Sequence, residues 1–329
     1  MTAVLYVTVV LCWSFTWYAI KMQLGLVSPE VSILWRFALS AALLWIGLAA
    51  SGRLKRVPAS RHRWFAAMGL CLFCLNFVMI YRSERFVASG VVSVIFTLST
   101  VFNIINARLF NRVRPSARTI LGAGLGVGGV ALLFGDTLAD LSAGTDTLSG
   151  IACAITGTLI FSFGNILATR ASGDGVDLPN AIVRAMTWGV AFLLMLVLLL
   201  GRPIILDPSP RYLLSLSFLS VFGTIIAFLA YATLLARIGP ARAAYASVLF
   251  PIIALTVSTL SEGYQWTLWA LIGAPLALAG NAVIFTEARP ATGKAQRHMS
   301  RICTAKSTGA IDGGAPVAPP AGGPPAIRS

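Results

Sequence analysis

Long apolar stretches recur along the chain from its start to about Glu287, and only short polar segments separate them. Each stretch is close to the 20 residues that a helix needs to cross the hydrocarbon core of a bilayer. Helices suit this solvent because they satisfy their own backbone hydrogen bonds. The pattern predicts an all-α polytopic membrane protein with ten transmembrane helices, over residues 3–20, 31–50, 64–81, 87–107, 117–135, 148–169, 179–200, 212–235, 240–261 and 267–287.

Composition agrees with a bilayer environment. Hydrophobic residues make up 57% of the 329 and charged residues only 11%, whereas a soluble chain is about 25% charged. The net charge of +14 raises the possibility of a nucleic-acid partner. The distribution of the bases, rather than their number, argues against that partner, because cytoplasmic loops of membrane proteins are enriched in Lys and Arg.

The bases also predict the orientation. With the N-terminus in the cytoplasm, 18 of the 25 bases fall inside and five fall outside. The outside five are Lys21, Arg82, Arg85, Arg202 and Arg211. We therefore expect an integral protein of the cell (plasma) membrane with both termini cytoplasmic, and a disordered cytoplasmic tail over residues 288–329, which is rich in Pro, Gly and Ala.

The chain repeats itself at an offset of about 150 residues. Residues 121–134 and 272–285 share six of fourteen positions at an offset of 151, and Arg36 aligns with Arg184 at an offset of 148. Each half, 3–135 and 147–287, then holds five spans, so the halves have opposite orientations. Inverted repeats with a substrate site near the midplane are typical of secondary transporters. Duplication without transport is the other reading.

Several residues resemble the EamA-type transporters of the drug/metabolite transporter superfamily. Trp13, Lys21, Pro29 and Arg36 resemble the first EamA repeat. The residues that resemble the second EamA repeat are Ala241–Tyr245, Phe250-Pro251, Ser261-Glu262-Gly263, Gly273 and Gly280. The resemblance covers about 3–287 and implies a ten-helix carrier of small metabolites, often moving them outward. One departure is Asn111, which stands where an acid is expected although its repeat mate is Glu262.

Polar residues within spans are costly in lipid and are candidates for function. Ser93, Thr97, Thr100 and Asn103 share one face of the fourth span. They suit the lining of a water-filled cavity, or else packing between helices. Pro251 lies in the ninth span, where it marks either an interrupted helix at the site or a simple kink.

Further candidates complete the predicted substrate pathway. Tyr231, Tyr245 and Ser247 supply hydroxyl groups from the second half. Lys21, Arg36 and Arg184 are possible anion contacts, since a guanidinium binds carboxylate or phosphate bidentately. The alternative for these cations is that they extend to the nearest interface.

The acids predict the energetics. None of the eleven lies in the middle of a span, and both histidines lie outside the spans. Proton-driven carriers commonly use intramembrane Asp, Glu or His, so we expect transport that does not need a proton gradient. Glu262, at the outer end of the ninth span, is the possible proton site at the rim.

Other chemistry is not predicted. Gly124-x-Gly126-x-x-Gly129 lies inside an apolar helix with no preceding strand, and Cys71-x-x-Cys74 has no partner pair. We expect no enzyme activity, no cofactor and no metal. The predicted function is alternating-access transport of small organic metabolites or drugs across the cell membrane, with export favoured. The alternative is a non-transporting receptor or assembly protein with the same fold; the oligomeric state is not predicted.

Overall fold

A computed structural model describes residues 2–112, 114–135, 145–172, 176–244 and 246–287. In these ranges the chain forms helices and no strands, which agrees with the predicted all-α class. The predicted disordered tail, residues 288–329, lies outside the described residues.

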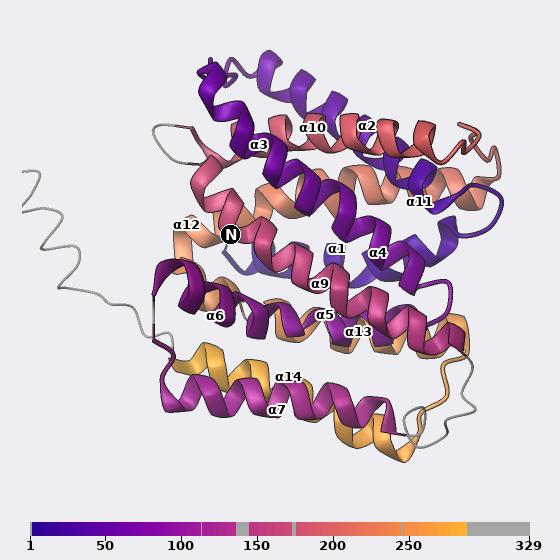
Figure 1. The fold of residues 1–329 in the computed structure, drawn as a ribbon, viewed down its shortest axis with the longest axis vertical. Helices are drawn as coiled ribbons and strands as arrows, with labels where there is room; N and C mark the ends of the chain where they lie inside the picture. The colour runs from indigo at the N-terminus through magenta and orange to yellow at the C-terminus, as the bar shows by residue number, and fades with distance from the viewer. Residues whose placement is uncertain (1, 113, 136–144, 173–175, 245, 288–329) are drawn as a thin grey trace, which may run out of the picture. The chain divides into compact units, whose positions relative to one another are not determined.

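The first half is built from helices that lie side by side across Figure 1. Its elements are α1 (Thr2–Gln23), α2 (Pro29–Ala50), η1 (Ala59–Arg61), α3 (His62–Gly69), η2 (Leu70–Leu75), α4 (Asn76–Ser83), α5 (Ser89–Phe96), α6 (Leu98–Asn111) and α7 (Ala117–Leu133). Segments η1 to α4 form one continuous helical rod, residues 59–83.

The second half follows the same order. Its elements are α9 (Thr145–Ala171), α10 (Leu178–Leu199), α11 (Pro210–Ser220), η3 (Val221–Ile226), α12 (Ala227–Ala244), α13 (Ala246–Glu262) and α14 (Leu268–Glu287). In the described residues, eight helical segments of both halves together are long and apolar enough to cross a bilayer. The helices α7 and α13 are apolar but shorter, at 17 residues each, the lower end of the spanning range.

Two predicted boundaries differ from the structure. The predicted connection at 236–239 is helical, because α12 continues to Ala244 through Gly239 and Pro240, against the low helix propensity of both residues. The predicted interruption at Pro251 is not seen, because α13 runs through this proline. Pro251 is the sixth residue of α13, so the hydrogen bond that its missing N–H would make lies in the first turns of the helix. The fourth predicted span is instead divided, between α5 and α6, at Thr97.

Two π-helical segments interrupt otherwise α-helical rods. They are η2, at Leu70–Leu75, and η3, at Val221–Ile226. Their first residues are 151 apart, the same offset that aligns residues 121–134 with 272–285. A π-helical turn is rare in proteins and occurs frequently at functional sites.

Helices of the first half pack against helices of the second. The pairs are α1–α13 and α6–α9, α3–α10 and α2–α11, and α2–α10, α5–α13 and α7–α14. Figure 1 shows α2–α10 and α7–α14 at opposite edges of the bundle.

Glycines allow α7 and α14 to approach closely. A Cβ on Gly129 would lie 2.2 Å from the backbone nitrogen of Ala277, and a Cβ on Gly280 would lie 2.5 Å from the carbonyl oxygen of Gly122. Gly124 and Gly128 have nothing within 4 Å of such an atom. The small-residue face therefore runs through Gly122 and Gly129, as is common for helix pairs in membranes.

The Gly129→Ala variant should be less stable than the wild type. Its methyl group would meet backbone atoms of α14, which cannot move aside, and overpacking of this kind typically costs about 1–3 kcal/mol. Gly128→Ala, one residue away in open space, should be neutral or slightly stabilising through helix propensity. Thermal unfolding of both variants in detergent checks this, and equal melting temperatures would contradict the packing.

Candidate functional site

A cavity of about 900 Å³ lies at the C-terminal end of α1, where Lys21 and Leu24 line it. We call it the distal vestibule. Its lining comes from the end of α1, the α1–α2 connection, the end of α4, the start of α9, the residues after α10 and the start of α11. These segments fall on the predicted outer side.

The distal vestibule is lined by an excess of bases. Lys21, Arg82, Arg85, Arg202 and Arg211 all contribute to its wall, which has one acid, Glu30. The Arg82 guanidinium donates from Nη2 to Oε1 of Glu30 at 2.8 Å, which pairs that acid. These are the same five bases that the sequence places outside, so residues far apart in sequence gather around one cavity.

Arg36 lies deeper, on α2, and only 1% of it is exposed. Its Nε and Nη2 each donate to the Thr224 hydroxyl at 3.3 Å, and its guanidinium lies over the rings of Phe37 and Phe77. Its Nη1 has no hydrogen-bond partner. Arg36 does not extend to the surface, and a buried cation with an unused donor is costly unless something binds it.

Further polar side chains connect Arg36 with the distal vestibule. Tyr81 lies close enough to interact with the Arg36 guanidinium, and its hydroxyl donates to Oε1 of Gln23 at 2.8 Å. Gln23 is buried, and its Nε2 has no partner. It precedes Leu24, a residue of the vestibule wall. Arg36, Tyr81 and Gln23 thus form a buried polar chain, and the residue after Gln23 belongs to the vestibule wall.

Lys21, Glu84 and Glu262 form a second cluster at the distal end. Lys21 donates from Nζ to the backbone carbonyls of Glu84 and Val87, at 2.5 and 3.5 Å. Glu84, the residue after α4 ends, is fully buried, and neither carboxyl oxygen has a hydrogen-bond partner. Burial first, and then the charge of Glu262, raise the pKa of Glu84 well above its usual value, against the opposing charge of Lys21.

Glu262 holds the distal ends of α13 and α5 together. Its Oε2 accepts from the backbone nitrogen of Ser89 at 3.1 Å, and its Oε1 accepts from the Ser89 hydroxyl. Ser89 is the first residue of α5, where a carboxylate is favoured by the helix dipole. Near this contact, a Cβ on Gly90 would lie 2.7 Å from Cα of Leu255, so the two helices are in backbone contact.

Arg184, the repeat mate of Arg36, has a different environment. Its Nη1 donates to the carbonyl and the side-chain oxygen of Asn180, at 2.9 and 3.0 Å, and its Nη2 donates to the carbonyl of Lys55. Its guanidinium also lies over the Trp45 ring. Arg184 therefore anchors the connection between α2 and α3 to α10.

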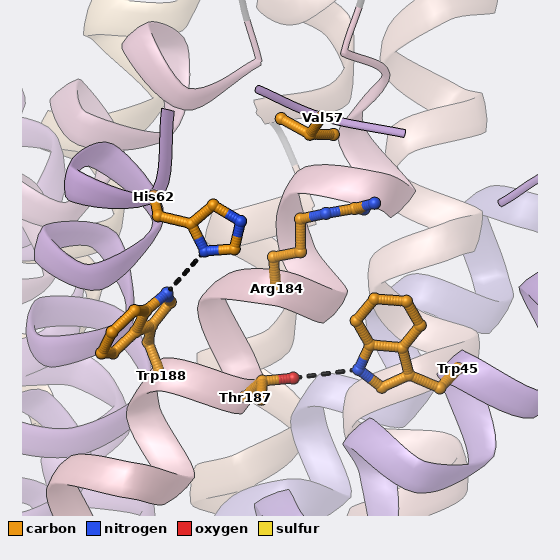
Figure 2. Close-up of a pocket in the computed structure, with 6 residues that line it drawn as sticks. All are labelled: Trp45, Val57, His62, Arg184, Thr187 and Trp188. Carbon is orange, nitrogen blue, oxygen red and sulfur yellow. Dashed lines mark hydrogen bonds between the residues drawn. The ribbon is translucent and has the colours of Figure 1, made fainter. Parts of the chain in front are cut away.

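A smaller cavity of about 280 Å³ lies beside Arg184 (Figure 2). Its lining residues are Trp45, Val57, His62, Arg184, Thr187 and Trp188. Trp45 donates from Nε1 to the Thr187 hydroxyl at 2.9 Å, and Trp188 donates from Nε1 to Nδ1 of His62 at 3.2 Å. These polar groups are used within the wall, so the pocket offers a ligand little beyond aromatic surface.

The predicted stripe on the fourth span is buried between helices. The Thr97 hydroxyl donates to the carbonyl of Val94 at 2.6 Å, within its own helix, and Thr100 is also buried. Asn103 Oδ1 accepts from the hydroxyl of Ser162 at 2.8 Å and from Nδ2 of Asn165 at 3.4 Å. Asn103 thus contacts α9, and the cavity-lining role of the stripe stays a prediction.

The predicted residues of the second half lie near an aromatic cluster. The Tyr231 ring centroid is 5.0 Å from that of Trp13, and Phe250, which precedes Pro251, stacks on Trp17 at 6.1 Å. Ser247 is half-buried on α13. Tyr245 lies outside the described residues. The structure therefore brings Tyr231 and the Pro251 region together around α1. Phe96 connects Trp17 of this cluster to Phe161 on α9.

Sequence reasoning did not identify Gln23, Tyr81 or Glu84. Each is near the end of a predicted span or in a connection, where polar residues are ordinary. Their burial results from packing between α1, α2 and α4, which spacing along one helix does not reveal. The position of Glu84 two residues after Arg82 does not predict their different environments either. Glu84 is buried, whereas Arg82 pairs with Glu30 at the vestibule.

Comparison with known proteins identifies the fold and the family. A model of the EamA-like transporter family matches residues 1–135 and 148–286. The chain is 24% identical over 249 residues to the "Uncharacterized inner membrane transporter YedA" of Escherichia coli strain K12, covering 75% of this chain and 78% of that protein. It is 23% identical over 265 residues to "Protein PagO" of Salmonella typhimurium, covering 80% and 85%.

One solved crystal structure has the same fold. It superposes with a TM-score of 0.63 at 16% identity, over 89% of this chain and 99% of that one. The two matched segments contain Arg36, Glu84 and Glu262. The chain therefore belongs to the EamA-like transporter family and is a membrane transporter.

Proposed function

We propose that the protein is a secondary transporter that exports small organic metabolites or drugs by alternating access. The single observation that carries this proposal is Arg36, a buried cation whose Nη1 has no hydrogen-bond partner although its Nε and Nη2 donate to the Thr224 hydroxyl. A charge inside a membrane protein is costly, and such residues mark substrate paths.

The arrangement of the helices supports two inverted five-helix halves, residues 3–135 and 147–287. The corresponding pairs α1–α13 and α9–α6, and the π-helical segments η2 and η3 at an offset of 151, are what an inverted repeat would produce. Alternating access then follows if the halves rock about a site between them. The tight contact of α5 with α13 at Glu262 is one that this mechanism requires to separate when the site between the halves opens to the distal side.

Flux measurements on purified protein in liposomes test the proposal. A panel of radiolabelled metabolites identifies the solute, and unlabelled solute on the opposite side should then accelerate its exchange. Acceleration of this kind requires a carrier that alternates. Flux that rises without saturation and ignores the opposite side would contradict alternating access, and net movement only inward under matched gradients would contradict export.

The orientation is tested by thiol labelling in intact cells. We expect a cysteine introduced at Asp140 to react with a membrane-impermeant reagent and one introduced at Arg56 to react only after lysis. The reason is the excess of predicted inside bases, five of which lie between residues 53 and 63. The reverse pattern would place both termini outside.

The proposed pathway between the fourth and ninth spans includes Thr97, Thr100 and Asn103, with Tyr231, Tyr245, Ser247 and Pro251 from the other half. We expect Asn103→Leu to abolish transport while the protein stays folded and inserted. Ser162→Ala removes the hydroxyl that donates to Asn103 and is the matched control for packing. Normal transport by Asn103→Leu, or equal loss in both variants, would contradict a direct role in the pathway.

A further inference from the structure

We infer that the distal vestibule is a binding site for a small organic anion that carries a carboxylate or a phosphate. The inference names the substrate class of the proposed transporter, so it rests on that proposal. The first observation is convergence: the end of α1, the end of α4, the residues after α10 and the start of α11 each place at least one base on the same wall.

The charge of the wall is strongly positive. Five bases face one acid, and that acid is already paired with Arg82. For Lys21, Arg85, Arg202 and Arg211, the described residues supply no carboxylate within ion-pair distance. Lys21 is held by two backbone carbonyls, which do not neutralise it.

Among the described acids outside the wall, Asp207 accepts from the backbone nitrogen of Ser209 at 2.8 Å, Asp146 is exposed in the first turn of α9, and Glu84 lies near Lys21. None of these three contributes to the wall itself, where the described bases outnumber the acids five to one. Like charges in a cleft with low-dielectric walls reinforce one another and raise the local concentration of the opposite ion. The vestibule should therefore concentrate anions.

Bases on the outer side also need an explanation, because loops on that side are normally poor in Lys and Arg. If the five were only interface anchors, they would be distributed around the bundle. Instead all of them line one cavity. Arginine suits this purpose because its planar guanidinium binds a carboxylate or phosphate through two parallel hydrogen bonds.

Size and apolar lining favour an organic anion over an inorganic ion. The volume of about 900 Å³ lies within the usual range of about 300–1,000 Å³ for small-molecule sites. Leu24, Leu26, Val27, Phe86 and Ile205 supply apolar surface beside the bases. Below the vestibule, the chain of Gln23, Tyr81 and Arg36 offers unused donors to an anion that moves inward.

An anionic lipid headgroup carries the same chemistry, so the test separates the two sources. The full chain is placed in nanodiscs of phosphatidylcholine alone, and thermal unfolding is followed with benzoate, phenyl phosphate, inorganic phosphate and neutral benzamide. We expect benzoate and phenyl phosphate to raise the melting temperature saturably, inorganic phosphate less, and benzamide not at all. The dissociation constants should rise about tenfold between 50 and 500 mM salt, since added salt screens the bases.

The double variant Arg202→Gln/Arg211→Gln should bind both aromatic anions at least tenfold more weakly. Arg237→Gln, an exposed base away from the vestibule wall, is the matched control and should bind like the wild type. A second set of nanodiscs contains phosphatidylglycerol. Stabilisation by that lipid, with no response to soluble anions in phosphatidylcholine, would overturn the inference, and so would equal binding by the double variant and the wild type.

Binding and flux fail separately. Anion binding at the vestibule without flux of any solute would contradict the proposed transport and leave the vestibule site standing. Saturable flux of neutral or cationic solutes, without binding of the anionic probes, would support transport and overturn the substrate class.

Discussion

Arg36→Gln should lower the transport of a carboxylate- or phosphate-bearing solute by about 10- to 100-fold, with the protein still folded. A hydrogen bond to a charged group contributes about 1.5–3 kcal/mol, which corresponds to a factor of this size. Glutamine keeps a donor for the Thr224 hydroxyl but removes the positive charge and the unused Nη1. Initial rates in liposomes, with saturation curves, measure the effect.

The matched control is Arg184→Gln. This residue is the repeat mate of Arg36, but its donors are bound by Asn180 and by the carbonyl of Lys55. Its loss should lower the melting temperature, because each hydrogen bond of a charged group contributes about 1.5–3 kcal/mol. Transport of the same solute should stay within about threefold, because these bonds hold the connection between α2 and α3. If both variants transport normally, Arg36 is only a buried packing residue.

The contrast between these two arginines shows where sequence reasoning ends. Alignment at an offset of 148 identifies them as a pair, and both lie about six residues into their helices. Spacing alone does not reveal that Arg184 reaches a neighbouring connection while Arg36 faces the π-helical segment η3. A Cβ on Gly223, in that segment, would lie only 2.8 Å from Oγ1 of Thr16, so the missing side chain there lets η3 approach α1 closely beside the guanidinium.

The helices themselves follow from the hydrophobic pattern. The predicted spans 31–50 and 267–287 correspond to α2 and α14 within two residues at each end, because apolar length in lipid leaves little choice of structure. The substrate pathway is less accessible to this reasoning. The helical face that Asn103 shares with Thr97 and Thr100 predicts that it lines a cavity. In the structure its Oδ1 accepts from the Ser162 hydroxyl on α9, so the cavity-lining role stays a prediction.

Glu262 makes a contact that has to break if the distal ends of α5 and α13 separate. Its carboxylate joins α13 to the first residue of α5, and Gly90 allows the two backbones to touch just below. Opening the distal side requires these contacts to separate. A carboxylate that binds a helix N-terminus in one state and is released in the other can bias the equilibrium between the two states. Its place at the rim as a possible proton site stays a prediction.

Glu84→Gln should stabilise the protein at alkaline pH and flatten the dependence of its stability on pH. Burial and the charge of Glu262 raise the pKa of Glu84 well above the usual value, so the folded protein keeps a proton that the unfolded chain has released. Where the unfolded state binds fewer protons, stability falls as pH rises. The contribution of Glu84 is fully present below its ordinary pKa and is lost as pH rises through the raised one.

Melting temperatures of the wild type and Glu84→Gln, measured from pH 5 to pH 9, check this expectation. The two curves should approach each other at pH 5 and separate by a few degrees at pH 9, since about 1 kcal/mol moves the melting temperature by roughly 2–4 °C in a domain of 150–250 residues. Asp146→Asn, which neutralises an exposed acid on α9, is the matched control and should follow the wild type. Parallel curves for Glu84→Gln and the wild type would mean that Glu84 does not hold this proton.

The same variant tests whether a proton gradient drives transport. Glutamine mimics the protonated carboxyl group permanently, so a carrier that does not need the gradient should keep its net flux when Glu84 is replaced and when an ionophore holds the pH gradient at zero. Both results are expected, because the described spans hold no acid in their middle and Glu84 lies at the distal end of its rod. If accumulation collapses with the gradient and Glu84→Gln reproduces that collapse, Glu84 is the coupling site. The cluster of Lys21, Glu262 and the buried Glu84 would then link proton binding to the contact between α13 and α5.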